Sequence, residues 1–201
     1  MFELVQGEGG VCALQQDFVD EIARLCKEND LIMIADEVQT GNGRTGKLYA
    51  YMHYGIMPDV VSTAKGLGGG LPIGATMLGE KVKDIFTPGL NGSTFGANPV
   101  CCSGAINVLR RLTDDFLAEV DKKAQLIRET LSGAEGVEEI SGLGLMIGIK
   151  TVKEAKEVVS YCQDKGVLVL TAKDKVRLLP PLNIETQLLK EALEVIKEAC
   201  K

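Results

Sequence analysis

An acid and a lysine each follow a stretch of sequence that reads as a buried strand. Asp36 comes directly after the apolar run Leu31–Ala35, and Lys65 comes directly after the stretch DVVSTA, which begins at Asp59. In an open parallel sheet the carboxyl ends of neighbouring strands lie at one edge, and ligands bind there. An amine and a carboxylate at such an edge are the two protein groups that an aldehyde cofactor with a pyridine ring needs. The amine forms a Schiff base, and the acid pairs with the ring nitrogen.

The same two residues also have simpler interpretations, which their spacing alone leaves open. Lys65 could be an exposed loop lysine, and Asp36 could be a strand-end carboxylate that caps a loop. Two features favour chemistry. Asp36 and Glu37 are adjacent acids at the end of a buried strand, which is costly unless a cation or hydrogen-bond donors receive them. The stretch GLGGG after Lys65 lets backbone approach closely, and a lysine in a walled site loses solvation, so its neutral amine becomes a nucleophile.

A literal G-x-G-x-x-G motif runs from Gly41 to Gly46 and raises the alternative of a dinucleotide-binding loop. Such a loop needs its glycines directly between a strand and a helix N-terminus, where backbone amides meet the pyrophosphate. Here several residues separate the predicted strand from Gly41, and the segment that ends at Gly55 is short for a crossover helix. Asp59 begins the next predicted strand, whereas a ribose-binding acid belongs at its end. We therefore expect the glycines to shape a tight loop.

Cysteine and histidine usage does not suggest a metal site. The six cysteines form no Cys-x-x-Cys pair, and His53 is the only histidine. Several cysteines lie on apolar helix faces, so we expect reduced structural thiols in a cytoplasmic protein. His53 is expected to be a packed or surface residue, and a hydrolytic triad built on histidine has little support.

Composition excludes several further classes of protein. The chain has 201 residues, enough for one large domain or two small ones, and its 45% hydrophobic content indicates a folded core. The net charge of −6, with no basic run, argues against a nucleic-acid partner. No apolar stretch approaches membrane-spanning length, and the first residues, MFELVQGEGG, lack a secretory signal pattern. We therefore expect no association with membranes.

The predicted elements must place Asp36 and Lys65 at one sheet edge. A helix over Gln15–Asn29 is followed by strands at Leu31–Ala35, Asp59–Thr63 and Ile73–Leu78. A helix followed by buried strands predicts a mostly parallel sheet with helices on its faces, that is, an α/β fold. Residues 98–112 and 116–131 are predicted helices, and Pro99 suits the first turn of its helix.

The remainder of the chain predicts a smaller α+β domain, so we expect domains at residues 1–114 and 115–201. Its predicted strands alternate with two amphipathic helices. The strands are expected at Val137–Ile140, Leu145–Ile149, Val167–Leu170 and Val176–Leu179, and the helices at Ala155–Cys162 and Leu188–Ala199.

Five stretches, taken together, strongly resemble the class III pyridoxal-phosphate aminotransferases, most closely the acetylornithine/ornithine-type branch. They occur in family order and span nearly the whole chain. The stretches are QGEGGV from Gln6, ADEVQTGNGRTG from Ala35, PDVVSTAKGLGGGLPIGA from Pro58, STFGANP from Ser93 and VRLLPPLNI from Val176. The resemblance implies a fold-type I PLP-transferase, with a partial large domain followed by the small domain. It also implies pyridoxal 5'-phosphate as the cofactor.

The resemblance implies a role for each matching cofactor residue. Lys65 resembles the lysine that forms the Schiff base and then moves a proton during catalysis. Asp36 resembles the partner of the pyridine nitrogen, where a carboxylate keeps the ring protonated so that it can accept charge. Val38 would pack on the ring face, and Gln39 would reach the phenolic oxygen.

Further residues resemble the family's phosphate and substrate groups. Ser93 and Thr94 are similar to the phosphate ligands that one subunit donates to the other across a homodimer with shared active sites. Arg177 resembles the fork that binds the substrate α-carboxylate in a bidentate manner. Glu8 resembles the residue that pairs with this arginine when the substrate does not need it. The pair would let one site accept both a basic amino acid and 2-oxoglutarate.

The amino donor stays open, because acetylornithine, ornithine, succinylornithine and 4-aminobutyrate enzymes share these motifs. An N-acetylornithine donor would imply a place in arginine biosynthesis. The family chain is also substantially longer, and its first half, which carries part of the phosphate and substrate sites, has no counterpart before Met1. We therefore expect this chain alone to bind the cofactor weakly and to transaminate poorly. The alternative is a non-catalytic fragment or assembly module of such an enzyme.

Overall fold

The computed structural model describes all residues, 1–201, and the chain forms two compact units. The first unit comprises Met1–Leu4, Leu14–Gly43 and Lys47–Phe116. The second comprises Val5–Ala13, Arg44–Gly46 and Leu117–Lys201. None of the helices is both long enough and apolar enough to cross a membrane.

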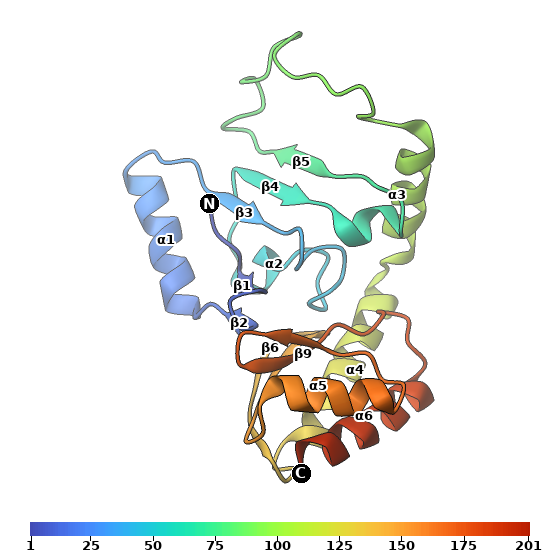
Figure 1. Cartoon of the computed structure of the whole chain (residues 1–201). Coiled ribbons are helices and arrows are strands. Elements are labelled where there is room, and N and C mark those ends of the chain that lie inside the picture. Colours follow the sequence, from blue (N-terminus) through green and yellow to red (C-terminus); the bar gives the residue numbers. More distant parts are fainter. The chain divides into compact units, whose positions relative to one another are not determined.

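The first unit is built on a three-stranded sheet in the order β3-β4-β5 (Figure 1). Strand β3 (Ile34–Asp36) runs parallel to β4 (Val60–Thr63), and their register sets Asp36 opposite Ser62. Phe2 pairs with Ala35 on the other edge of β3. The helices of this unit are α1 (Gln16–Glu28), α2 (Tyr51–Tyr54), the 3-10 helix η1 (Lys65–Gly68) and α3 (Pro99–Arg111).

Strand β5 (Ala75–Leu78) corrects one expectation from the sequence. It pairs antiparallel with β4, so the prediction that the stretch Ile73–Leu78 would extend a parallel sheet was wrong. A parallel return needs a crossover of about a dozen residues or more, usually a helix. The connection from β4 to β5 holds only the single turn of η1 and several glycines, so the chain turns back beside the strand it has just left.

A small apolar cluster lies beneath this sheet. Tyr49 and Tyr51 stack with ring centroids 5.9 Å apart and an angle of 7° between the ring planes. The buried members of the cluster are Leu4, Val19, Ala35, Tyr49, Ala50, Tyr51 and Val61. Helix α1 contributes only Val19 as a buried residue, and Phe18 and Leu25 on the same helix are exposed. The apolar pattern of α1 predicted the helix correctly, but within this chain most of its apolar face remains uncovered.

The start of α3 follows the chemistry predicted for Pro99. Proline occupies the first turn, where its missing N–H costs no hydrogen bond. The side chain of Asn98 accepts hydrogen bonds from the backbone N–H groups of Val100, at 3.0 Å, and Cys101, at 3.3 Å. A cap of this kind contributes about 1 kcal/mol and fixes where the helix begins.

The second unit is a four-stranded antiparallel sheet in the order β6-β7-β9-β8, together with a short hairpin. The sheet strands are β6 (Val137–Leu143), β7 (Met146–Thr151), β8 (Leu170–Ala172) and β9 (Lys175–Leu178). The hairpin strands are β1 (Val5–Gln6) and β2 (Cys12–Ala13). The helices are α4 (Asp114–Leu131), most of which belongs to this unit, α5 (Ala155–Asp164) and α6 (Thr186–Cys200).

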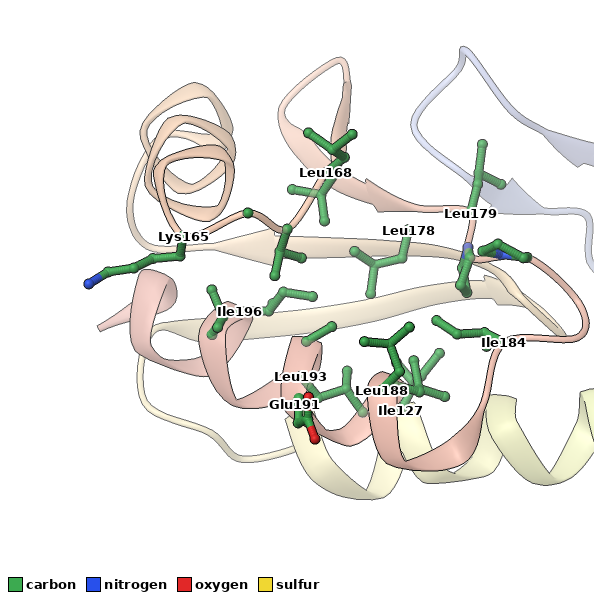
Figure 2. A pocket seen from close by; sticks show the side chains of 18 residues that line it. Ile127, Lys165, Leu168, Leu178, Leu179, Ile184, Leu188, Glu191, Leu193 and Ile196 are labelled. Atoms are coloured by element: carbon green, nitrogen blue, oxygen red, sulfur yellow. The ribbon is translucent and has the colours of Figure 1, made fainter.

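Apolar side chains of β7, α4, α5 and α6 form the core of the second unit. Ile127, Leu131, Ile147, Ile149 and Val158 are fully buried. Fully burying a side chain of this size stabilises the fold by about 1.5–3 kcal/mol. Beside this core, α6 and the segments 165–169 and 178–184 line an open cavity of about 530 Å³, which is mostly apolar (Figure 2).

Candidate active site

Asp36 ends β3 at the carboxyl edge of the parallel pair and is partly buried. Its Oδ1 accepts hydrogen bonds from Val38 N, at 3.0 Å, and from Ser62 Oγ, at 3.2 Å. No lysine or arginine pairs with it, and Oδ2 accepts no hydrogen bond within the chain. The carboxylate is therefore held in place through one oxygen, while the other remains available to a donor from outside the chain.

Lys65 follows the neighbouring strand β4 by two residues and begins η1. Its φ of +44° lies in the left-handed region, which few residues other than glycine adopt. The turn is closed by Leu67 N, which donates to Ala64 O at 2.9 Å. The expectation of a walled lysine is wrong for this chain, because Lys65 is exposed.

Close packing against α3 sets the position of η1. Gly104 of α3 leaves the space that this packing needs, since a Cβ there would lie 2.7 Å from Leu71 Cδ1 and 3.2 Å from Gly68 O. Gly69 and Gly70 follow with φ values of +59° and +106°. A Cβ at Gly69 would lie 2.9 Å from Val108 Cγ2 of α3, so this glycine allows both the turn and its contact with the helix.

Glu37, next to Asp36, is the acid that the fold buries, with 0% of its surface exposed. No cation pairs with it. Its carboxylate accepts from Tyr51 N, at 2.8 Å, from Thr40 Oγ1 and from the backbone of Ala50. Burial, above all, raises the pKa of Glu37. Glu37 thus closes the loop after β3 onto the start of α2, and this fixes the path of the chain directly after Asp36.

Asn42 lies within the glycine motif and reaches the segment before Lys65. Its Nδ2 donates to Thr63 Oγ1 at 2.9 Å and to Ala64 O at 3.2 Å. The motif is a tight loop, as predicted, with Asn42 and Gly43 at φ values of +56° and +87°. Sequence reasoning missed the role of Asn42. An asparagine between two glycines is a typical left-handed residue, and that signal could have directed attention to its side chain.

The remaining cofactor residues predicted from the sequence lie in two places. Val38 and Gln39 directly follow Asp36 and are partly buried. Ser93 and Thr94 lie in the segment between β5 and α3 and are exposed. The structure brings Val38 into contact with Asp36, but it gives Ser93 and Thr94 no hydrogen bond to Asp36 or Lys65.

Glu8 and Arg177 meet in the second unit. Arg177 lies on β9, opposite Gly148 of β7 and Leu170 of β8, and is 9% exposed. Its Nη1 donates to Glu8 Oε1 at 2.6 Å, and its Nε is buried without a partner. The Glu8 side chain is 74% exposed. The pair therefore has one fixed member, the arginine, and one member that can move into solvent.

Arg44 is a second arginine of this unit, and sequence reasoning missed its role. Its Nη1 donates to Pro180 O at 2.6 Å and to Leu145 O at 3.2 Å. No acid pairs with it, and burial lowers its pKa to about 10. Pro180 lies two residues after β9, so Arg44 holds the segment that follows Arg177 against the β6–β7 turn.

Comparison with known proteins identifies the family of this chain. The family model described as aminotransferase class-III matches residues 1–200. The chain belongs to the class III aminotransferases. The acetylornithine aminotransferase of Haemophilus ducreyi is 48% identical over 200 residues, which are 98% of this chain and 51% of that relative. Enzymes of this family depend on pyridoxal phosphate.

Solved structures of class III aminotransferases share the fold. The ornithine aminotransferase from Toxoplasma gondii ME49 matches with a TM-score of 0.92 and 31% identity, covering 98% of this chain and 50% of that one. The N-acetylornithine aminotransferase from Stenotrophomonas maltophilia K279a matches with a TM-score of 0.88 and 33% identity, covering 98% and 54%. These are fold-type I enzymes, so the predicted fold class is confirmed. The chain spans about half the length of the relatives it matches.

The residues of the first unit fit the family's cofactor. A pyridine ring with a protonated nitrogen needs an acceptor, and Asp36 Oδ2 is one without a competing donor. An aldehyde needs a nearby amine, and Lys65 carries one just after the end of the adjacent strand β4. No group of three or more His, Cys, Asp or Glu side chains is arranged to hold a metal ion.

Proposed function

We propose that this chain forms part of an aminotransferase that moves an amino group from N-acetylornithine, or a related diamine amino acid, to 2-oxoglutarate. The observation that carries the proposal is the placement of Asp36 at the end of β3 and of Lys65 two residues after the end of β4, the strand parallel to it. The donor is suggested by relatives named acetylornithine aminotransferase, which are 38–48% identical to this chain. Because ornithine aminotransferases are among the similar structures, ornithine is the alternative amino donor.

Each residue of the first unit has a defined task in this proposal. Pyridoxal phosphate, when bound, supplies the electron sink that makes the substrate Cα acidic. Lys65 would hold the cofactor aldehyde through Nζ, and its amine, when free, would move the substrate Cα proton. Asp36 would keep a proton on the ring nitrogen. Val38 would pack against the ring face, and Gln39 would bind the phenolic oxygen.

Glu8 and Arg177 are proposed to handle the substrate carboxylate. A buried guanidinium offers a bidentate fork, whereas the exposed carboxylate of Glu8 can leave with little loss of packing. With Glu8 in place the positive charge is neutralised, and with Glu8 displaced Arg177 binds a carboxylate. The two states suit a cycle in which a basic amino acid and a 2-oxo acid alternate.

We further propose that the whole enzyme is a homodimer with shared active sites. Ser93 and Thr94 are exposed and make no hydrogen bond to Lys65, which suits ligands that serve the phosphate in the other subunit. Residues 1–114 then form the second half of the cofactor-binding domain, and residues 115–201 form the small domain. Because about half of the family length lies outside this chain, we expect the isolated chain to bind pyridoxal phosphate weakly.

Borohydride trapping on the purified chain tests the proposal. Pyridoxal phosphate is added, the product is reduced, and peptide mass spectrometry locates the modified lysines. Lys173 is a matched control, because it is also exposed and also has a positive φ, +53° compared with +44° for Lys65. The proposal predicts several-fold greater modification at Lys65 than at Lys173.

Two variants test whether the trapped cofactor is bound at Lys65. Lys65→Ala should remove most of the trapped cofactor, while Lys173→Ala should leave the amount nearly unchanged. Equal modification of both lysines in the wild-type chain would contradict the assignment of Lys65. It would instead support a fragment that takes part in assembly without binding the cofactor.

A further inference from the structure

The side chain of Asn42 is almost sealed inside the first unit, at 4% exposure. Its two amide hydrogens go to two consecutive residues, since Nδ2 donates to Thr63 Oγ1 at 2.9 Å and to Ala64 O at 3.2 Å. Thr63 is the last residue of β4, and Ala64 alone connects it to Lys65. Asn42 thus forms hydrogen bonds to the two residues that set the backbone direction at Lys65.

The orientation of this amide is set by its neighbours. Ala64 O is a backbone carbonyl and can only accept, so the NH₂ group must face it. The Thr63 hydroxyl oxygen accepts the other hydrogen of the same NH₂ group. Asn42 Oδ1 is consequently turned away, and it is buried without any partner.

This arrangement has a cost, which argues that it serves a purpose. A buried carbonyl oxygen without a partner costs about 1–3 kcal/mol. An apolar side chain of similar size would avoid that cost, but it would give up both donated hydrogen bonds. Native structures retain few such unpaired buried atoms, and those that remain call for a specific reason.

The reason lies in the peptide bond between Ala64 and Lys65. The peptide is planar, so fixing the direction of Ala64 O also fixes the direction of the Lys65 N–H. Lys65 then starts from a left-handed conformation, with a φ of +44°, which is unfavourable for a lysine in the absence of support. Ala64 O receives that support twice, from Asn42 Nδ2 and from Leu67 N.

We propose that Asn42 is a positioning residue for Lys65. It locks the Ala64–Lys65 peptide and so fixes the backbone direction from which the lysine side chain starts. This role rests on the proposed function of Lys65. Asn42 itself touches neither the cofactor nor the substrate, and it acts only through the backbone of the lysine.

Asn42→Gly isolates this contribution. Glycine adopts a φ of +56° without strain, so the variant removes the side-chain amide and adds no backbone strain. Asn29→Gly is the matched control. Asn29 lies at the end of α1 in the same unit, and its Nδ2 also donates to a backbone carbonyl, Leu25 O, at 3.0 Å.

The first measurement needs no cofactor. Hydrogen exchange of the Leu67 amide, which bonds to Ala64 O, is followed by NMR in the purified chain. Asn42→Gly should speed this exchange about tenfold relative to the wild type, and Asn29→Gly should leave it unchanged. A change of less than twofold in Asn42→Gly would overturn the proposal.

The second measurement is the ratio of borohydride-trapped cofactor at Lys65 to that at Lys173. Asn42→Gly should lower this ratio from several-fold to near one at equal fold content by circular dichroism. A residue with only a general stabilising role would lower the melting temperature and leave the ratio as it is in the wild type, which would refute the inference.

A second variant and the wild-type result distinguish failure of the Asn42 proposal from failure of the proposed function. Should Asn42→Gly fail to fold, Asn42→Asp takes its place, because it has the same shape but sets an oxygen against Ala64 O. It is expected to reduce the ratio equally. A wild-type chain that does not favour Lys65 over Lys173 would refute the proposed function, while the exchange measurement still decides the role of Asn42.

Discussion

Glu37 offers a sharp test of how the loop after Asp36 is held. The carboxylate is fully buried and accepts hydrogen bonds from Thr40 Oγ1, Tyr51 N and the Ala50 backbone, and no cation pairs with it. Glu37→Ala leaves these donors without an acceptor in the interior. At about 1–3 kcal/mol for each unsatisfied buried donor, we expect a loss of roughly 3 kcal/mol or more. Glu37→Gln keeps one acceptor oxygen, so its loss should be about 1 kcal/mol.

The pH dependence of Glu37 has a definite sign. Burial raises its pKa in the folded chain above the ordinary value of 4.5, so the folded state binds this proton more tightly than the unfolded chain does. Its contribution to stability is therefore complete below pH 4.5 and is lost as the pH rises through the folded pKa. Glu37→Gln cannot titrate, so its free energy of unfolding relative to the wild type should improve over that range.

Urea unfolding at a series of pH values measures both effects. The chain has no tryptophan and four tyrosines, two of which, Tyr49 and Tyr51, stack in the cluster next to this loop. Tyrosine fluorescence and circular dichroism can therefore follow the transition. Glu28→Gln, on the exposed surface of α1, is the control and should change stability by less than about 0.5 kcal/mol. Parallel pH curves for the wild type and Glu37→Gln would refute the reasoning, as would a loss below about 1 kcal/mol for Glu37→Ala.

Three further outcomes follow from the structure. Arg44→Met removes the donors to Leu145 O and Pro180 O but also removes a buried charge, so we expect the free energy of unfolding to fall by about 1–2 kcal/mol. An unchanged midpoint in urea would show that Arg44 does not hold these two segments together. Glu8→Gln leaves Arg177 without its carboxylate and should lower the free energy of unfolding by about 1 kcal/mol at low salt. The loss should be smaller in 1 M salt, because Glu8 is mostly exposed and salt screens the pair. Equal losses at both salt concentrations would argue against an ion pair. The purified chain should transaminate N-acetylornithine far more slowly than a full-length relative in a coupled glutamate assay, and normal turnover would overturn that expectation.

The sequence anticipated the regular elements better than the irregular ones. Helical spacing placed α1 within one residue at each end, and Pro99 marked the start of α3. Strands β1 and β2, with two residues each, and the single turns α2 and η1 were missed, because such short elements have no periodicity to detect. The strand predicted at Val167–Leu170 lies at Leu170–Ala172, since an apolar run alone does not fix strand register.

In the candidate site, sequence reasoning proposed Asp36 and Lys65 but not the residues that hold their backbone. It did not identify Glu37 as the buried member of its acid pair. Strand alternation contained that signal, because Met33, Ala35 and Glu37 have the same parity and are all buried. The partners of Asn42 are 21 and 22 residues away, and those of Arg44 are 101 and 136 residues away. Contacts of this kind are set by tertiary structure and leave no local pattern in a single sequence.

The central claim is that Lys65 and Asp36 hold one pyridine aldehyde from two sides. The most direct test is the ¹⁵N NMR signal of ring-labelled pyridoxal phosphate that has been trapped on Lys65 by borohydride. In the wild-type chain the ring nitrogen should give the signal of a protonated pyridine at neutral pH, and in Asp36→Asn it should give that of a neutral one. The same ring-nitrogen signal in both proteins would contradict the claim.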